Sequence, residues 1–296
     1  MTQTEFATTA KKYWTPERTA KVIGTKKYPI TPLSAPHLLR MLGILNADSS
    51  ISPNNMHKFI QINHMFTLIE PHISELRERH KLLNILDAGC GKSYLTFLLA
   101  WFFNGSDSCK IFGVDSNKKL IQDCQSKAKT LGFEEFLNFE AQSLLSLEWT
   151  QESRAHCVIS LHACDTATDM ALAFAIKQKS DFIAVAPCCQ AELARKWKEA
   201  PSSQHALNPV FHTPQLRREV AAQMTDALRV CLMRANGYEV TCTEFVDSAH
   251  TPKNRLITCI RRGNYLKSAQ TEYEELKSYL GGHSIMLEDL LKTSCV

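Results

Sequence analysis

The sequence lacks several features, and each absence removes a class of protein or site. No stretch approaches the roughly 20 consecutive apolar residues that a membrane-spanning helix needs. The amino terminus has no charged segment followed by an apolar one, so we expect no secretory signal and a cytoplasmic protein. No Cys-x-x-Cys pair occurs, which argues against a structural zinc site, and we expect no metal.

The remaining composition is that of an ordinary globular protein. Hydrophobic residues make up 44% of the chain and charged residues 22%. A length of 296 residues suits one large core, or one domain with appendages. The 11 cysteines are an odd number without a signal peptide, so we expect reduced thiols rather than a disulfide framework.

The glycine-containing segment 82–93 also lacks what two well-known phosphate-binding loops require. A dinucleotide loop needs a small residue three positions after its second glycine, and here that residue is Tyr94. A P-loop ending in Gly91-Lys92-Ser93 would need a glycine at Leu86, inside a predicted strand. Both loops are therefore excluded.

What the segment does contain is an apolar strand that ends in Asp87, followed by Gly89, Gly91 and a helix. Glycines without a Cβ allow a tight turn and a close approach to a ligand, and strand ends of this kind bind ligands in α/β sheets. The next predicted strand ends in Asp115, where a carboxylate can accept hydrogen bonds from ribose hydroxyls. Either acid alone would be read as a helix cap or a turn residue, but together in this order they favour a nucleoside ligand.

This pattern resembles class I S-adenosylmethionine (SAM) dependent methyltransferases. The resemblance implies S-adenosyl-L-methionine as the cofactor, with Asp87 and the two glycines at its methionine end and Asp115 at its ribose. The cofactor-binding residues it implies are Asp87, Gly89, Cys90, Gly91, Lys92, Asp115, Ser116, Gln142, Ser143, Leu161 and His162.

Strand and helix signals alternate along the middle of the chain, which is typical of a parallel sheet. We predict strands at 82–86, 110–114, 137–140, 157–161 and 181–186, and helices at 93–103, 117–131, 167–178, 190–199 and 214–236. Two further strands, 238–245 and 256–261, are joined by a loop too short for a crossover and must form an antiparallel hairpin. By the resemblance, this is an α/β, Rossmann-like class I methyltransferase fold, a seven-stranded sheet with a terminal antiparallel hairpin.

Three regions follow from composition. Residues 1–70 are predicted to be a basic, mostly helical accessory segment for substrate recognition, with a helix from Asn55 that ends at Pro71 and a short helix at 73–79. Residues 71–266 form the methyltransferase domain, and 267–296 an acidic helical extension with a solvated face. The basic first 30 residues carry Tyr13, Trp14 and Tyr28, which suits contact with nucleic acid, although a solvated, mobile terminus fits equally well.

Three loops deliver reactive side chains to the same edge of the predicted sheet. They are Leu-His-Ala-Cys-Asp at 161–165, Pro-Cys-Cys-Gln at 187–190 and Thr-Pro-Lys-Asn-Arg at 251–255. With the glycine loop, they resemble one branch of the class I enzymes over residues 55–262. That branch includes the carboxyl-terminal domain of the glutathione S-transferase C-terminal domain-containing protein and its methyltransferase-like relatives. This chain has Asp165 and Gln190 where the branch would place glycine and an aromatic residue or histidine.

Two catalytic routes remain open. His162 can act as a general base with Asp165 as its acceptor, because histidine titrates near neutrality. Alternatively, a thiolate of Cys164, Cys188 or Cys189 could add to a pyrimidine, a placement that resembles RNA cytosine methyltransferases. The same cysteines could instead be small buried apolar residues.

The residues predicted to bind the substrate are Gln190, His250, Lys253 and Arg255. The last three, in the hairpin loop, could hold an anionic substrate such as an RNA phosphate, although they could equally be solvated. We therefore predict a SAM-dependent methyltransferase that acts on RNA, either tRNA or rRNA. The alternatives are a methyltransferase for protein or a small molecule, and a non-catalytic SAM-binding or RNA-binding protein.

Overall fold

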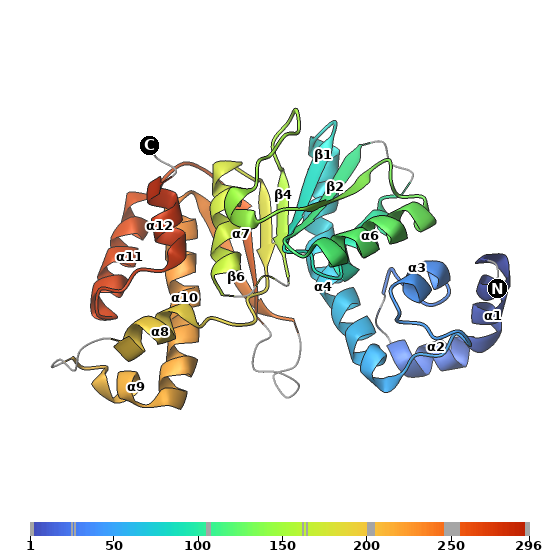
Figure 1. Ribbon diagram of the computed structural model, residues 1–296, viewed down its shortest axis with the longest axis horizontal. Coiled ribbons are helices and arrows are strands. Elements are labelled where there is room, and N and C mark those ends of the chain that lie inside the picture. Colours follow the sequence, from blue (N-terminus) through green and yellow to red (C-terminus); the bar gives the residue numbers. More distant parts are fainter. Residues whose placement is uncertain are drawn as a thin grey trace. The chain divides into compact units, whose positions relative to one another are not determined.

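The computed structural model describes residues 3–24, 26, 28–104, 108–161, 163, 165–199, 205–245 and 255–293. Its centre is a seven-stranded sheet in the order β3-β2-β1-β4-β5-β7-β6 (Figure 1). The strands are β1 (Leu83–Ala88), β2 (Cys109–Asp115), β3 (Leu137–Ala141), β4 (Cys157–Ser160), β5 (Phe182–Val185), β6 (Tyr238–Glu244) and β7 (Arg255–Arg261). Each predicted strand is present, with its ends shifted by no more than about two residues.

Strand directions follow the prediction. β1 pairs in parallel with β4, β4 with β5, and β2 with β3. β7 is antiparallel to both β5 and β6, with Val185 opposite Ile257 and Val240 opposite Cys259. The fold is therefore the predicted Rossmann-like arrangement with a terminal antiparallel hairpin. All residues of β1, β4 and β5 are buried, as expected for central strands of a sheet.

The chain divides into two compact units. Unit 1 comprises Met1–Leu83 and Gly91–Ala141, and unit 2 comprises Asn84–Cys90 and Gln142–Val296. The helices of unit 1 are α1 (Gln3–Tyr13), α2 (Pro16–Ile23), α3 (Pro36–Met41), α4 (Pro53–Arg79), α5 (Tyr94–Phe102) and α6 (Lys118–Leu131). Those of unit 2 are the 3-10 helix η1 (Leu144–Ser146), α7 (Thr166–Lys177), α8 (Glu192–Glu199), α9 (Asn208–His212), α10 (Pro214–Ala235), α11 (Lys267–Tyr279) and α12 (Met286–Thr293).

α4 is one long helix with Pro71 in its interior, so the prediction of a helix that ends at Pro71 and a separate one at 73–79 is wrong. Proline removes one backbone donor and usually breaks a helix. Here Ile69 and Ile73, on either side of it, are both fully buried. Packing of this apolar face continues the helix through the proline, a tertiary effect that local sequence rules do not contain.

The aromatic residues of the amino-terminal segment belong largely to the core of unit 1. Trp14 is 3% exposed, and its indole N–H donates to the carbonyl of Ser49 at 2.8 Å. Tyr28 is half-buried and meets Phe59 edge to face. Trp14 therefore cannot stack on a nucleic acid base while unit 1 is folded, which corrects the expectation that it belongs to an exposed, base-contacting arm.

The acidic carboxyl-terminal extension is packed rather than simply solvated. α11 lies along α10, and α12 packs on α7 (Figure 1). Glu288 of α12 is buried, and its carboxylate accepts hydrogen bonds from the Tyr273 hydroxyl at 2.7 Å and the Lys277 ammonium at 3.0 Å. Lys292 lies 2.7 Å from the same carboxylate. The prediction of a solvated face is therefore wrong at Glu288.

This cluster gives the extension a defined pH response. Burial alone would raise the pKa of Glu288, but hydrogen bonds from Lys292, Tyr273 and Lys277 outweigh it and hold the pKa below its ordinary value. A lowered folded-state pKa stabilises the fold above the unfolded value of about 4.3, and this stabilisation is lost as the pH falls through the folded value. We expect Glu288→Gln to cost about 1–3 kcal/mol near neutral pH and much less near about pH 3. Urea unfolding at both pH values measures this, with the more exposed Glu274→Gln as control. An equal loss at both pH values would contradict it.

Candidate functional site

The loop after β1 begins with a turn that only glycine fits well. Asp87 ends the buried strand, and Gly89 follows with a φ of 72°. A Cβ on Gly89 would lie 3.1 Å from the Cβ of Ala163, so a larger residue would meet both a steric limit and an unfavourable backbone conformation. The Ser160 hydroxyl donates to the carbonyl of Ala88 at 2.7 Å and ties the end of β4 to this turn.

The second part of the loop, in unit 1, is held by α6 and by the end of β2. Gly91 and Ser93 have φ values of 54° and 56°. The Cys124 thiol lies 3.8 Å from the Gly91 carbonyl and 3.5 Å from the Ser93 hydroxyl. Asp115 makes the stronger contact, because its Oδ2 accepts the Gly91 N–H at 3.0 Å.

Asp115 therefore does more than the sequence suggested. Its Oδ1 accepts the Asn117 N–H at 2.8 Å, while its Oδ2 holds Gly91. A carboxylate offers about four acceptor positions, so about two remain for ligand hydroxyls. The side chain is only partly buried. Asp115 thus fixes the glycine loop and keeps acceptor capacity at the same time.

The other predicted cofactor residues fall into different environments. Oε1 of Gln142 is buried and accepts no hydrogen bond from the described part of the chain, so it is an acceptor without a donor. The Ser143 hydroxyl accepts the Leu145 N–H at 3.3 Å and caps η1. Cys90 and Leu161 are buried, whereas Lys92 and Ser116 are exposed. His162, Cys164, His250 and Lys253, all predicted site residues, lie outside the described residues.

In unit 2, Asp165 joins the loop after β4 to the segment after β5. Its N–H donates to the Cys189 carbonyl at 2.7 Å. Its carboxylate accepts the N–H groups of Ala191 and Glu192 at 2.8 and 3.0 Å, next to the first turn of α8, and the Arg195 guanidinium at 2.8 Å. Asp165 was predicted as an acceptor for a catalytic base. In the structure this carboxylate positions the two loops relative to each other.

Asp165 also has a φ of 54° and a ψ of −119°, a conformation that favours glycine. We therefore expect Asp165→Ala to cost about 2–3 kcal/mol, because it loses these hydrogen bonds and keeps the backbone strain. Asp165→Gly should cost about 1 kcal/mol less, because it relieves that strain. Urea unfolding of the two variants measures the difference. Equal losses would show that the backbone conformation is not costly.

Arg229 of α10 is the centre of a buried ionic network behind these loops. It is 0% exposed, and its Nε donates to Asp169 Oδ1 at 2.8 Å. Its two terminal nitrogens donate to Asp226 at 3.1 Å and to the carbonyl of Asp165 at 2.8 Å. Burial tends to lower the pKa of Arg229, but Asp169 and Asp226 outweigh it and raise that pKa. Burial raises the pKa of Asp169, and the charge of Arg229 opposes this.

The same network holds two predicted substrate-binding residues. Asp226 Oδ2 accepts hydrogen bonds from the Gln190 amide at 2.9 Å and from Arg255 at 2.6 Å. Arg255 also donates to Gln223 at 2.5 Å, and its side chain remains 32% exposed. Gln190 and Arg255 are therefore brought together by Asp226, although they come from different elements. The sequence analysis missed Asp169, Asp226 and Arg229. The sequence signal that could have revealed these three residues is a charged side chain on an otherwise apolar face of a helix.

The cysteines differ from one another in state. Among the described residues, the cysteines that form no disulfide are Cys90, Cys109, Cys124, Cys157, Cys189, Cys231, Cys242 and Cys259. Cys188 is disulfide-bonded, so the expectation of reduced thiols is wrong at this residue. A sulfur in a disulfide cannot add to a pyrimidine until it is reduced. Of the adjacent pair, Cys189 is therefore the available thiol, and it is half-buried.

Two classes of site receive no support from the part of the chain that the structure describes. No three His, Cys, Asp or Glu side chains gather there in a way that could hold a metal ion. Among the same residues, no helix combines the length and apolar character needed to cross a membrane. The candidate residues are therefore described within each unit: Gly91 held by Asp115 in unit 1, and the loops held by Asp165 and Arg229 in unit 2.

Comparisons with known proteins agree with this description. Residues 57–196 match a family model described as a methyltransferase domain. This match supports a methyltransferase, with S-adenosyl-L-methionine as its cofactor. A search of curated proteins found no match.

Solved structures with a similar fold include three methyltransferases. PaMTH1 from Podospora anserina, with bound SAH, has 15% identity over 83% of this chain and 95% of its own, with a TM-score of 0.46. SAM-bound magnesium protoporphyrin IX methyltransferase from Synechocystis PCC 6803 has 14% identity over 86% and 97%, with a TM-score of 0.44. An rRNA methylase from Streptococcus thermophilus has 10% identity over 62% and 89%, with a TM-score of 0.41. Likenesses at this level carry no information on the substrate.

Proposed function

We propose that this protein is a SAM-dependent methyltransferase that acts on RNA, either tRNA or rRNA. One observation carries the enzyme class: Asp115 at the end of β2 holds the Gly91 N–H, within residues that match a methyltransferase domain. Within that class, the four motifs fit the branch that includes the carboxyl-terminal domain of the glutathione S-transferase C-terminal domain-containing protein.

The residues present fit this cofactor. The spare acceptor capacity of Asp115 suits ribose hydroxyls. The unmatched Oε1 of Gln142 suits a donor such as an adenine amino group. When bound, the cofactor supplies an electrophilic methyl group. The chain must then orient a nucleophile in line with it and remove a proton.

The distribution of charge favours RNA as the substrate. Unit 1 contains 17 Lys and Arg residues against 12 Asp and Glu, whereas unit 2 contains 17 against 18. The positive charge of the whole chain therefore resides in the unit that carries the amino-terminal segment. Such an excess of lysine and arginine attracts a phosphate backbone and releases its counterions.

Transfer of labelled methyl groups tests the proposal. The protein is incubated with methyl-labelled SAM and a cell extract, and label is counted in the RNA, protein and small-molecule fractions. Label in RNA of tRNA or rRNA size supports the proposal. Label in the protein or small-molecule fraction would instead show that the substrate is a protein or a small molecule. SAM binding without any transfer would indicate a non-catalytic binding protein.

The same assay separates the two chemical routes. Cys189→Ala should abolish transfer only if a thiolate adds to a pyrimidine, because alanine cannot form that bond. Cys242→Ala, at an exposed free cysteine, is the matched control. Full activity of Cys189→Ala would exclude Cys189 as the thiolate that adds to a pyrimidine.

A further inference from the structure

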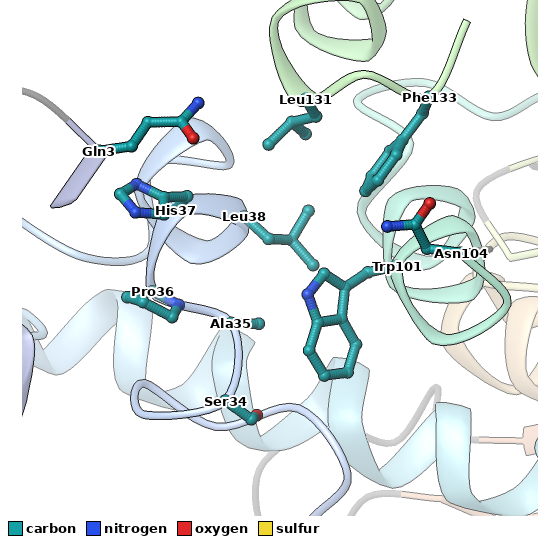
Figure 2. A pocket seen from close by; sticks show the side chains of 10 residues that line it. All are labelled: Gln3, Ser34, Ala35, Pro36, His37, Leu38, Trp101, Asn104, Leu131 and Phe133. Carbon is teal, nitrogen blue, oxygen red and sulfur yellow. The ribbon is translucent and has the colours of Figure 1, made fainter. Parts of the chain in front are cut away.

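Unit 1 contains a cavity of about 200 Å³ that is separate from the glycine loop (Figure 2). Its lining comes from the start of α1, from α3 and the residues before it, and from the ends of α5 and α6 together with the residues that follow each of them. Trp101 lies in the last turn of α5, whereas the glycine loop meets the first turn at Ser93. A nine-residue helix is roughly 14 Å long, so a ligand here would not touch a cofactor at the loop.

The lining of the cavity combines aromatic and apolar side chains with polar ones. Figure 2 shows the side chains of Leu38, Trp101 and Phe133 directed toward one space, although they come from three different elements. Leu38 and Phe133 are 1% and 3% exposed, so their positions are fixed by the core. Trp101 is only half-buried, which leaves part of its indole ring available for stacking.

Some polar side chains around this space make no hydrogen bond within the described residues, whereas the hydroxyl of Ser34, which also lines it, bonds within its own turn. Three of the four tryptophans donate their indole N–H to a backbone carbonyl: Trp14 to Ser49, Trp149 to Ser153 and Trp197 to Leu280.

Trp101 is the exception, since its indole N–H has no acceptor within the described residues. The side-chain amides of Gln3 and Asn104 likewise make no hydrogen bond there. Figure 2 shows both amides at the rim of the cavity, with His37 beside Gln3. The rim thus offers both donors and acceptors.

Size and chemistry together define the ligand. An apolar cavity of about 150 Å³ holds a benzene ring, so about 200 Å³ suits a heteroaromatic ring system of one or two rings. Unpaired nucleobases are recognised in this way, by stacking on an aromatic side chain and by hydrogen bonds to their edges. The positive charge of unit 1 suits the attached phosphates.

We propose that this cavity binds one unpaired nucleobase of an RNA substrate, stacked against Trp101 and contacted at its edge by Asn104 and Gln3. The inference rests on the proposed RNA methyltransferase function. It assigns the cavity to substrate recognition, at a distance from the site of methyl transfer.

Binding of short oligonucleotides tests the proposal. Fluorescein-labelled hexaadenylate and hexauridylate are titrated with wild-type protein, Trp101→Leu and Asn104→Ala, and anisotropy is recorded. We expect affinity for at least one probe to fall about tenfold in Trp101→Leu, the scale of one lost base stack, and less in Asn104→Ala. Tyr279→Leu, at an aromatic side chain that is 61% exposed in unit 2, should bind like wild type. Unchanged affinity in both cavity variants would overturn the proposal.

Two further measurements separate its possible failures. In the first, AMP or UMP competes with the labelled probe. If the free nucleotide binds as tightly as the hexanucleotide, the ligand of the cavity is a free nucleotide, and the proposal that it binds a base of RNA is overturned.

In the second, methylation of RNA is measured. The cavity variants should raise KM and leave kcat unchanged, because the cavity is remote from the glycine loop. If RNA is methylated equally well by all variants, the inference fails and the proposed function stands. If wild type methylates no RNA but binds the probes through Trp101, the function fails and base binding stands. Asn104 is exposed, so its variant tests the cavity without disturbing the core.

Discussion

Replacing Asp115 with alanine should weaken SAM binding by at least about 100-fold, measured by calorimetric titration or equilibrium dialysis. The change removes the acceptors for ribose hydroxyls, and hydrogen bonds to a charged group contribute about 1.5–3 kcal/mol each. It also releases the Gly91 N–H, which Asp115 accepts at 3.0 Å, so the glycine loop loses its support. Ligand contact and loop position are lost together, which is why we expect a large effect.

Two comparisons make the Asp115 result specific. Asp123→Ala removes an exposed carboxylate from α6 of the same unit, where it pairs with Lys127, and should leave SAM affinity unchanged. Asp115→Asn should be nearly as weak as alanine, because an amide nitrogen would face the Gly91 or Asn117 N–H, donor to donor. If Asp115 only shapes a turn, both variants will lose stability and bind SAM normally. That outcome would remove the assignment of this loop to the cofactor.

Much of the fold could be predicted because its signals are local. The central strands are apolar runs bounded by turn residues, and the helices between them carry apolar residues at helical spacing. The terminal hairpin followed from the length of one loop. Two predictions were wrong: that a helix ends at Pro71 and that the acid Glu288 is solvated. In both cases, packing against elements distant in the sequence determines the structure. A proline stays inside α4 since the helix face around it is packed, and an acid is buried because three donors surround it.

The candidate site, like the fold, could be predicted where its signals are local in the sequence but not where it joins residues that are distant in the sequence. The residue types of the glycine loop pointed to a nucleoside ligand, and the structure adds that Asp115 supports the loop itself. The network behind the other loops was missed because it joins residues far apart in the sequence. Arg229 and Asp169 are separated by 60 positions, and only the fold brings α7 and α10 together. The i, i+3 pair of Asp226 and Arg229 was visible, but such pairs are usually solvated.

The network has a large expected effect of its own. Arg229→Met should lower the free energy of unfolding by about 3–5 kcal/mol near neutral pH, because it leaves Asp169 buried without its cation and removes one of the two cations that pair with Asp226. Without Arg229, the pKa of Asp169 should rise further above its ordinary value, since burial already raises it. A raised folded-state pKa means that the fold is favoured at low pH and loses stability as pH rises through the unfolded value. The variant should therefore regain stability as the pH falls toward the unfolded value of an Asp carboxyl, about 3.9, which urea unfolding over a pH series measures.

A matched residue on the same helix provides the control for Arg229. Arg234 pairs with Glu272, and the two side chains are 41% and 47% exposed, so Arg234→Met should cost no more than about 1 kcal/mol. The double variant Arg229→Met with Asp169→Asn should recover part of the loss, because it removes the charge that the loss of Arg229 leaves uncompensated. If Arg229→Met is no more destabilising than Arg234→Met, the network does not hold the loops after β4 and β5. Gln190 and Arg255 would then need another support, because Asp226, which holds both, is itself fixed by Arg229.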